Sequence, residues 1–257
     1  SVAIGDIDGD GKSDMAVAHY NGSIVSVLRN RSTSGSILSS SFATKVDFAT
    51  GSNPREVSIG DIDGDGKSDL AVANQSSHTV SVLRNISTSG SITTSSFATK
   101  VDFATGTEPQ SVTIGDIDGD GKSDMTVAHY SNTVSVLRNI STSGTVSFAT
   151  KVDFTAGSNP RSVAIGDLDG DGKSDLAVAN SGGGTVSVLR NISTSGSITT
   201  SSFATKVDFT IVGTTYSTAI GDIDGDGKSD LAFANYPYQI VSVLRNNNIS
   251  VPTVAPN

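Results

Sequence analysis

The sequence predicts an all-β repeat protein, and three observations lead to that class. A nine-residue acidic stretch, DIDGDGKSD or a close variant, occurs five times, beginning at Asp6, Asp61, Asp116, Asp167 and Asp222. Successive copies lie 55, 55, 51 and 55 residues apart, a period typical of repeat architectures. The segments between them are short, rich in Val and Ile, and separated by Gly, Asp, Asn and Ser, as β-strands are. We therefore expect one array of five units and not two domains.

Each unit divides into four expected strands. The first three are exemplified by SVAIGD (1–6), DLAVAN (69–74) and TVSVLRN (79–85). The fourth, FATKVDF (42–48), places Phe, Thr and Val side chains on one face and charged side chains on the other. In DLAVAN the large apolar side chains face one side and the alanines face the other. Both faces should therefore be buried, as in small sheets stacked face to face.

Four antiparallel strands per unit at this period predict a β-propeller, in which four-stranded blades pack radially. A solenoid of stacked sheets is the alternative. Five repeats are counted but only four copies of the Phe-containing strand, so the last blade lacks its fourth strand. We expect residues 1–248 to form a five-bladed ring with an incomplete blade, and residues 249–257 to form a Pro-containing tail or linker. A fragment of a longer propeller, or a blade completed by a strand from a neighbouring molecule, also fits.

The acidic stretch has the composition of a loop that binds a hard divalent cation. Positions 1, 3, 5 and 9 are Asp, and position 7 is a Lys that could offer only its backbone carbonyl. The two glycines let the backbone turn around an ion, and all-oxygen ligation favours calcium over zinc or copper. We expect one calcium ion per repeat, five in all. The expected ligands are Asp6, Asp8, Asp10, Lys12 and Asp14; Asp61, Asp63, Asp65, Lys67 and Asp69; Asp116, Asp118, Asp120, Lys122 and Asp124; Asp167, Asp169, Asp171, Lys173 and Asp175; and Asp222, Asp224, Asp226, Lys228 and Asp230.

A metal-free acidic turn is the alternative, since Asp-Gly pairs form turns without metal. An EF-hand is excluded because position 12 is apolar, for example Val17 and Val72, where that motif has an acidic residue.

The loops hold 20 of the 26 acidic residues, so five divalent ions would offset the net charge of −9. No basic cluster suggests nucleic-acid binding, and no apolar run suggests insertion into a membrane. The absence of cysteine excludes disulfides and thiol chemistry.

The connection between the second and third strands varies from repeat to repeat and carries the three histidines and four of the five tyrosines. Strand alternation places it, together with the crossovers between repeats, on the face opposite the acidic loops. Tyrosine anchors interfaces and stacks on sugars, whereas free drift of loop sequence is the alternative. The residues expected to bind a glycan or protein ligand are Tyr20, His78, Tyr130, Tyr216, Tyr236 and Tyr238.

Asn-x-Ser sequons recur where the third strand leaves the sheet. They are potential glycosylation sites, although Asn also starts turns well without any glycan. The positions are Asn30, Asn85, Asn139, Asn191 and Asn248.

We expect no catalysis. The sequence suggests no Ser-His-Asp or Cys-His grouping, and the dense carboxylates are already assigned to metal. Of the remaining acidic residues, Asp47, Asp102, Asp153 and Asp208 recur in the Phe-containing strand, which indicates a structural role.

The run GDxDGDGxxDLAVAN, followed by SVLRN and the Phe-containing strand, resembles the FG-GAP and VCBS repeats of integrin-type propellers and bacterial surface proteins. The resemblance spans Ser1 to about Asn248. It implies an extracellular or cell-surface propeller in which calcium loops brace one face, while adhesion or ligand binding uses the other. The chain departs from the family in number, because these propellers typically close with seven blades. A second hypothesis is a structural subunit of a surface or extracellular filament, glycosylated at the sequons, that self-associates through the incomplete blade or the tail.

Overall fold

The computed structural model describes residues 1–247, which form strands and turns. Within that range there is no helix with the length and apolarity needed to cross a membrane. The strands are β1 (Val2–Gly5), β2 (Asp14–His19), β3 (Ile24–Leu28), β4 (Val46–Ala49), β5 (Pro54–Gly60), β6 (Asp69–Asn74), β7 (Thr79–Leu83), β8 (Val101–Ala104), β9 (Pro109–Gly115), β10 (Asp124–His129), β11 (Thr133–Leu137), β12 (Val152–Thr155), β13 (Pro160–Gly166), β14 (Asp175–Asn180), β15 (Thr185–Leu189), β16 (Val207–Thr210), β17 (Thr214–Gly221), β18 (Asp230–Tyr236) and β19 (Ile240–Leu244).

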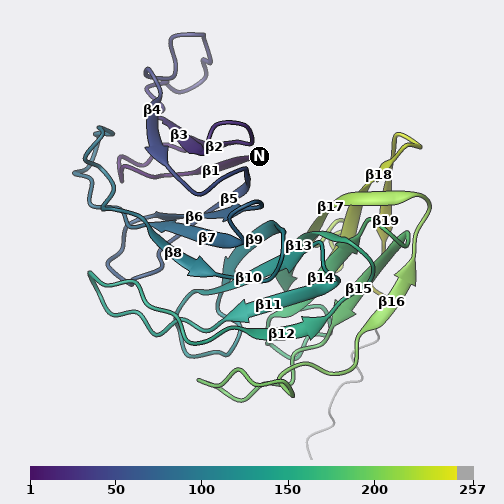
Figure 1. Ribbon diagram of the computed structural model, residues 1–257. Coiled ribbons are helices and arrows are strands. Elements are labelled where there is room, and N and C mark those ends of the chain that lie inside the picture. The colour runs from purple at the N-terminus through teal and green to yellow at the C-terminus, as the bar shows by residue number, and fades with distance from the viewer. Residues whose placement is uncertain (248–257) are drawn as a thin grey trace, which may run out of the picture.

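These strands form five antiparallel sheets, one per repeat, and in each sheet neighbours in sequence are neighbours in space. The first four sheets have four strands, and within residues 1–247 the fifth has three, β17–β19, in agreement with the expected incomplete blade. The first strands of successive sheets contact one another and so lie innermost. Figure 1 shows the sheets fanned in an arc, with the first and the fifth sheet at its two ends. The all-β, propeller-type architecture is confirmed, whereas closure into a five-bladed ring stays a prediction. The expected tail, residues 249–257, lies outside the described residues.

The core lies between adjacent sheets. Val25 of the first sheet packs in one buried cluster with Leu70 of the second, and Phe48 meets Phe97 edge to face with ring centroids 4.8 Å apart. Such aromatic pairs add about 1 kcal/mol beyond the area that they bury. The fourth strand is shorter than the seven residues expected. In the second sheet β8 begins at Val101, and Phe97 before it forms only an isolated bridge with Asn85. The equivalent edge-to-face pairs are Phe103 with Phe148 and Phe154 with Phe203.

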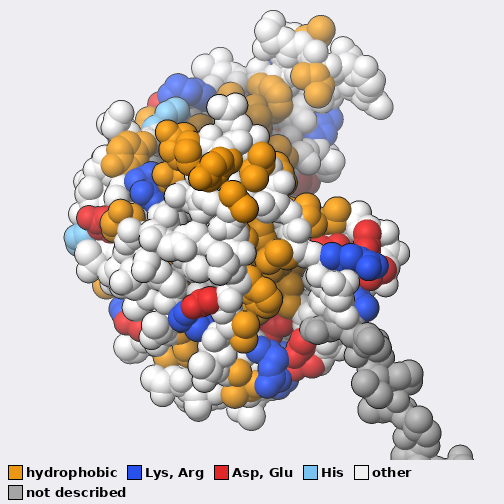
Figure 2. All heavy atoms as spheres, turned by 90° about the vertical axis from the view of Figure 1, so that its right-hand side faces the viewer, with side chains coloured by type: hydrophobic (Ala, Val, Ile, Leu, Met, Phe, Trp, Pro, Cys, Tyr) orange, Lys and Arg blue, Asp and Glu red, His pale blue; other side chains and the backbone are white. Residues whose placement is uncertain are grey.

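The missing strand of the fifth sheet leaves apolar surface uncovered on the neighbouring sheet. Phe209 of β16 is 43% exposed, whereas Phe48 and Phe154 at the same position are 7% exposed. The groove beside Phe209 is lined by apolar side chains of both sheets, including Val188 and Leu244. Figure 2 shows hydrophobic side chains gathered in a band on this side of the molecule. The incomplete blade therefore exposes core that the other repeats bury.

A polar network crosses the interior of each sheet near the end of its second strand. In the third sheet His129 Nε2 lies 2.8 Å from Ser135 Oγ, which donates a hydrogen bond to Asp153 Oδ1 at 2.5 Å. The serine lies between the other two groups, whereas a nucleophilic triad needs the histidine in the middle. The arrangement is therefore structural. The residues at the position of His129 in the other sheets are His19, Asn74, Asn180 and Asn235.

This network corrects the expectation that all three histidines lie on the variable face. His19 and His129 end strands β2 and β10, and His129 is fully buried. Only His78 lies in a connection and is exposed. The sequence varies at this position as a loop would, but the position is the last residue of the second strand.

The buried His129 should make stability depend on pH. Burial lowers its pKa to about 4, and an unfolded histidine has a pKa of about 6.5. Between these values the unfolded state binds the extra proton, so the free energy of unfolding should fall as the pH drops from about 6.5 to about 4, by up to about 3 kcal/mol from this residue. In His129→Asn, which installs the residue found in the second and fourth sheets, that part of the fall should disappear. Urea titrations at pH 7 and pH 4.5 would measure the difference.

The matched control is His19→Asn, at the same position in the first sheet but only half-buried, where the change should be smaller. Equal pH dependence in the wild type and in His129→Asn would contradict the assignment.

Candidate functional site

Each acidic loop joins the first and second strands of its sheet and wraps around its own carboxylates. In the second repeat Gly64 and Gly66 adopt φ values of +74° and +84°, a conformation that favours glycine. Their backbone amides donate to the two carboxylate oxygens of Asp61, at 2.8 and 2.9 Å. The loop geometry thus turns carboxylates from several positions toward one point.

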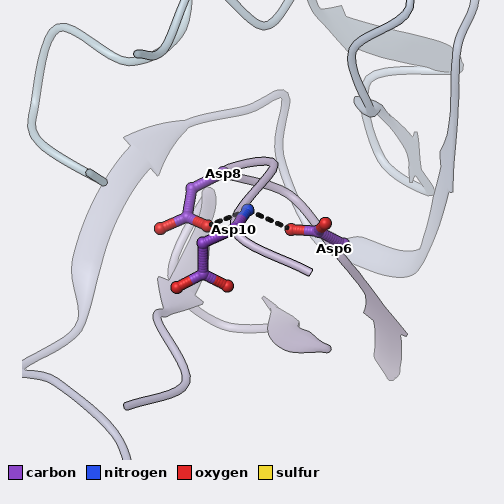
Figure 3. A group of neighbouring side chains, drawn as sticks. All are labelled: Asp6, Asp8 and Asp10. Carbon is purple, nitrogen blue, oxygen red and sulfur yellow. Dashed lines mark hydrogen bonds between the residues drawn. The ribbon is translucent and has the colours of Figure 1, made fainter. Parts of the chain in front are cut away.

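Three carboxylates converge in every loop, with oxygen atoms that all lie within 4.8 Å of one another. Figure 3 shows this for the first repeat, where the amide of Asp10 donates to Asp6 and Asp8 at 3.1 and 3.2 Å. Calcium binds oxygen at about 2.3–2.6 Å, so oxygens at this separation can surround one ion. The converging sets are Asp6, Asp8 and Asp10; Asp61, Asp63 and Asp69; Asp116, Asp118 and Asp124; Asp167, Asp169 and Asp175; and Asp222, Asp224 and Asp230.

The lysine at position 7 directs its ammonium group away from these carboxylates. Lys67 Nζ donates to the carbonyl of Ser87 at 2.9 Å, and Lys122 and Lys173 make the equivalent bonds to Ser141 and Ser193. In these three loops only the backbone carbonyl of the lysine is left for an ion, and its role as a ligand stays a prediction.

The Asp at position 9 anchors the loop to the sheet. Asp69 is fully buried, and its two oxygens accept the amides of Ile62 at 2.9 Å and Asn85 at 2.7 Å. Burial raises the pKa of Asp69 and of Asp124 to about 6, although the amide hydrogen bonds oppose the shift. In the fifth repeat the hydrogen bond from the amide of Asn246 lowers the pKa of Asp230. A cation in the inner loops would offset the cost of these buried charges.

An arginine that sequence reasoning missed supplies positive charge beside each loop. Arg29 follows β3 and contacts Asp8 at 2.5 Å and Asp10 at 3.0 Å. These guanidinium groups remain partly exposed, so each pair adds little stability by itself. The signal was present in the sequence, because the Arg of SVLRN recurs with every acidic loop. The other ion pairs are Arg84 with Asp63, Arg138 with Asp120, Arg190 with Asp169, and Arg245 with Asp224 and Asp226.

The asparagine after that arginine ties neighbouring repeats together. Asn85 Nδ2 donates to the carbonyl of Ser68 at 2.8 Å in its own loop and to that of Ile7 at 2.6 Å in the preceding loop. Asn139 and Asn191 repeat both contacts, and all three are fully buried. Glycosylation at Asn85, Asn139 and Asn191 stays a prediction, and a glycan on Nδ2 would displace these bonds in the folded chain.

The first repeat differs from this pattern, whereas the fifth repeats both contacts with a half-buried asparagine. Asn30 is half-buried, and its Nδ2 donates to Ser13 in its own loop. In the fifth repeat the equivalent residue is Asn246, which donates to Leu168 and Ser229. Asn248, the sequon expected there, lies outside the described residues.

The STSG turn between the third and fourth strands lies on the acidic loop of the preceding repeat. The amide of Gly90 donates to the carbonyl of Asp8 at 3.0 Å, and Ser89 Oγ donates to Gly9 at 2.8 Å. Gly144 donates to Asp63 Oδ2 at 2.9 Å in the next pair of repeats. The acidic loops and the STSG turns thus share one face, as strand alternation predicted.

The variable connections and the crossovers share the other face, where three of the expected ligand residues meet. The guanidinium of Arg161 lies 5.0 Å from the ring centre of Tyr130 and 5.5 Å from that of Tyr216. The rings of Tyr216 and Tyr236 lie 5.9 Å apart. We call Tyr130, Arg161, Tyr216 and Tyr236 the tyrosine–arginine cluster. All three tyrosines are exposed.

The remaining expected ligand residues make other contacts. Tyr20 pairs with Arg55, whose guanidinium is 4.9 Å from the ring centre. His78 Nδ1 accepts the amide of Glu108 at 3.0 Å, and the Tyr238 ring lies against Gly213. None of these contacts is made by Tyr130, Arg161, Tyr216 or Tyr236.

Sequence reasoning missed the arginines of this face. Arg55 and Arg161 follow the prolines that begin β5 and β13, and burial together with the neighbouring charge of Arg161 lowers the pKa of Arg55. Arg161 Nη1 also donates to Gln110 at 2.9 Å. The repeated Asn-Pro-Arg triplet was the available signal.

Comparison with known proteins identifies the family. The FG-GAP-like repeat matches residues 6–72, 61–127, 116–178 and 167–233, and the chain belongs to that family. None of the curated proteins matches the chain.

The fold is also found in solved structures. A lectin from Agrocybe aegerita that recognises non-reducing terminal N-acetylglucosamine is 19% identical, with a TM-score of 0.58, and the match covers 96% of this chain and 63% of the lectin. BBS1N in complex with ARL6DN, soaked with mercury, is 10% identical with a TM-score of 0.54 over 91% of this chain and 61% of that one. A crystal of that complex soaked with lead gives 14% identity and a TM-score of 0.52, over 96% and 82%. At these identities the similarity shows the fold alone.

The inter-repeat asparagine gives a direct test of the loop geometry. Asn139→Ala removes the bonds to Ile62, Ser123 and Ser141 in a buried place, so it should lower the free energy of unfolding by about 3 kcal/mol. Asn30→Ala, the same change without a preceding repeat, should cost about 1 kcal/mol. Urea denaturation of both variants would measure the two values. Equal losses would show that the contact with the preceding loop contributes nothing.

Proposed function

We propose that the chain is a non-catalytic, calcium-stabilised extracellular module that binds a glycan through the face opposite its acidic loops. The single observation that carries the ligand part is the tyrosine–arginine cluster, where the exposed rings of Tyr130 and Tyr216 lie against the guanidinium of Arg161 and the exposed ring of Tyr236 packs on Tyr216. Aromatic rings stack on sugar rings, and a guanidinium donates hydrogen bonds to hydroxyl or carboxylate groups. A protein ligand held by the same anchors is the alternative.

Two further facts support this proposal. The sequence varies between repeats mainly on this face, whereas the acidic loops hardly vary. The side chains that differ between repeats therefore lie where a ligand would bind. The similar Agrocybe aegerita protein is a lectin, while the similar BBS1N was crystallised with the protein ARL6DN. The fold therefore suits either class of ligand, and the exposed tyrosines favour a glycan.

The calcium part rests on the composition and shape of the loops. Every converging ligand is an oxygen, five loops repeat the arrangement, and the carboxylates outnumber the arginines beside them. Oxygen ligands select calcium or magnesium, and the flexible, Gly-containing loop suits the larger ion. Millimolar extracellular calcium would suffice even for weak sites. The location outside the cell is thus part of the same proposal.

Calcium binding should show a stoichiometry of five by titration calorimetry. Each site would stabilise the fold by about 2.7 kcal/mol at a calcium concentration 100 times its dissociation constant, so excess chelator should lower the melting temperature markedly. Asp116→Asn with Asp118→Asn should reduce the stoichiometry to four, while Glu108→Gln, outside the loops, should keep it at five. An unchanged melting temperature in chelator would rule out calcium as a structural element.

Ligand binding should depend on the tyrosine–arginine cluster. On a glycan array covering neutral, N-acetylglucosamine-terminated and acidic glycans, Tyr130→Ala and Arg161→Ala should each weaken the strongest signal about tenfold or more. Tyr20→Ala, a tyrosine that pairs with Arg55 and not with Arg161, should leave it unchanged. Equal melting temperatures would show that the variants fold. Binding that survives both cluster substitutions, or a blank array, would contradict the glycan proposal.

A further inference from the structure

The two ends of the arc expose side chains that every internal contact between sheets buries. Val57 and Val25 are 4% and 0% exposed between the first and second sheets. Val2 has the register position of Val57 on the first sheet but is 56% exposed, and Val241 has that of Val25 on the fifth sheet but is 71% exposed. Each end is thus one half of a contact that the chain makes four times internally.

A close fit between Ile and Gly defines that internal contact. The Ile near the end of each first strand lies over the Gly that ends the preceding first strand, as Ile59 does over Gly5. A Cβ atom on Gly5 would come within 3.2 Å of Ile59, so the position accepts no larger residue without a shift. The same contact joins Gly60 with Ile114, Gly115 with Ile165, and Gly166 with Ile220.

At the two ends both partners of this fit are free. Ile4, which has the register of Ile59, is 69% exposed. Gly221, at the end of β17, has nothing within 4 Å of where a Cβ would lie. The first sheet therefore carries the Ile of the contact, and the fifth sheet carries the Gly.

The hydrogen-bonding groups of the contact are also divided between the two ends of the arc. Within the chain, each inter-repeat Asn donates to the carbonyl that follows the first Asp of the preceding loop, as Asn85 does to Ile7. Asn30 of the first repeat is bonded only to Ser13 by its Nδ2 among the described contacts. At the other end, Ile223 has the position of Ile7 but is 53% exposed, whereas Ile7 is 1% exposed. The donor is thus at one end of the arc and the acceptor is at the other.

We propose that a second copy of this chain docks head to tail, with the first sheet of one copy covering the fifth sheet of the other. Ile4 of one copy would lie over Gly221 of the other, and Asn30 would donate to the carbonyl of Ile223. A second copy fits because it carries the complete Ile, Val and Asn pattern in the register that the internal contacts use. The incomplete blade does not prevent this docking, since the matched residues lie on the first three strands and the turn after the third.

The contact is heterologous, so it leaves a free head and a free tail on every dimer. Repetition of the contact gives a closed ring or a growing filament. The joint is therefore the face of the end sheets, and not the open edge of β19 or the tail. The inference depends neither on the metal nor on the ligand proposed above.

Sedimentation velocity over a range of concentrations tests this directly with residues 1–257 and two single variants. Gly221→Val fills the free position on the tail, where the monomer has space for it, and Ile4→Asp disables the head. The wild type should form species of two or more chains. Each variant alone should stay monomeric, with a dissociation constant raised about 100-fold or more. An equal mixture should form dimers and nothing larger, because each variant retains one intact end.

Val101→Ser, which removes an exposed apolar side chain from an internal sheet, should assemble like the wild type. Matching circular dichroism spectra and melting temperatures would show that the two end variants fold. A wild type that stays monomeric at every concentration would overturn the proposal. Assembly that persists in either variant alone would also overturn it, because the joint would then lie elsewhere.

Discussion

The structure depends on one repeated polar contact, in which a buried aspartate and the asparagine after the third strand fix the acidic loop. Asp69 accepts the backbone amide of Asn85, and the side chain of Asn85 reaches the preceding loop at Ile7. This contact sets the conformation of one loop and its place beside the next. Because the groups are buried, leaving any of them unpaired would cost about 1–3 kcal/mol. The spacing of the sheets follows from this contact as much as from the apolar core.

The two faces of the arc are therefore under different structural constraints. On one face, each acidic loop must fit its own sheet and the STSG turn of the next repeat, as Asp8 fits Gly90, so its sequence hardly varies. On the other face, the connections are held mainly by backbone hydrogen bonds, such as that from Tyr130 to Glu108. Side chains there are free to differ between repeats, and the tyrosine–arginine cluster forms where three repeats supply aromatic or cationic groups. A stable frame and a variable surface thus arise from the same repeat.

Local pattern was enough to predict the strands, the acidic loops, the incomplete fifth sheet and the division between the two faces. It failed where a residue's role is set by another repeat. Asn85 looks like a sequon, and only its distance to Ile7, 78 positions away, shows that its amide is occupied. His129 looked like loop variation, but pairing of β10 with β11 places it inside the sheet beside Ser135. Arg161 meets Tyr130 and Tyr216 only through the packing of three successive sheets.

The central claim is that each of the first four acidic loops is braced by the repeat that follows it and that calcium strengthens the brace. Hydrogen exchange at single amides can test it. The amides of Gly90 and Gly196 donate to the preceding loops at Asp8 and Asp118, whereas Gly35 has the same place in the first repeat and makes no such bond among the described residues. In calcium, Gly90 and Gly196 should be protected and Gly35 should exchange freely. In chelator, the first two should lose protection before the core strands do. Protection that is equal at all three glycines, or indifferent to calcium, would contradict the account.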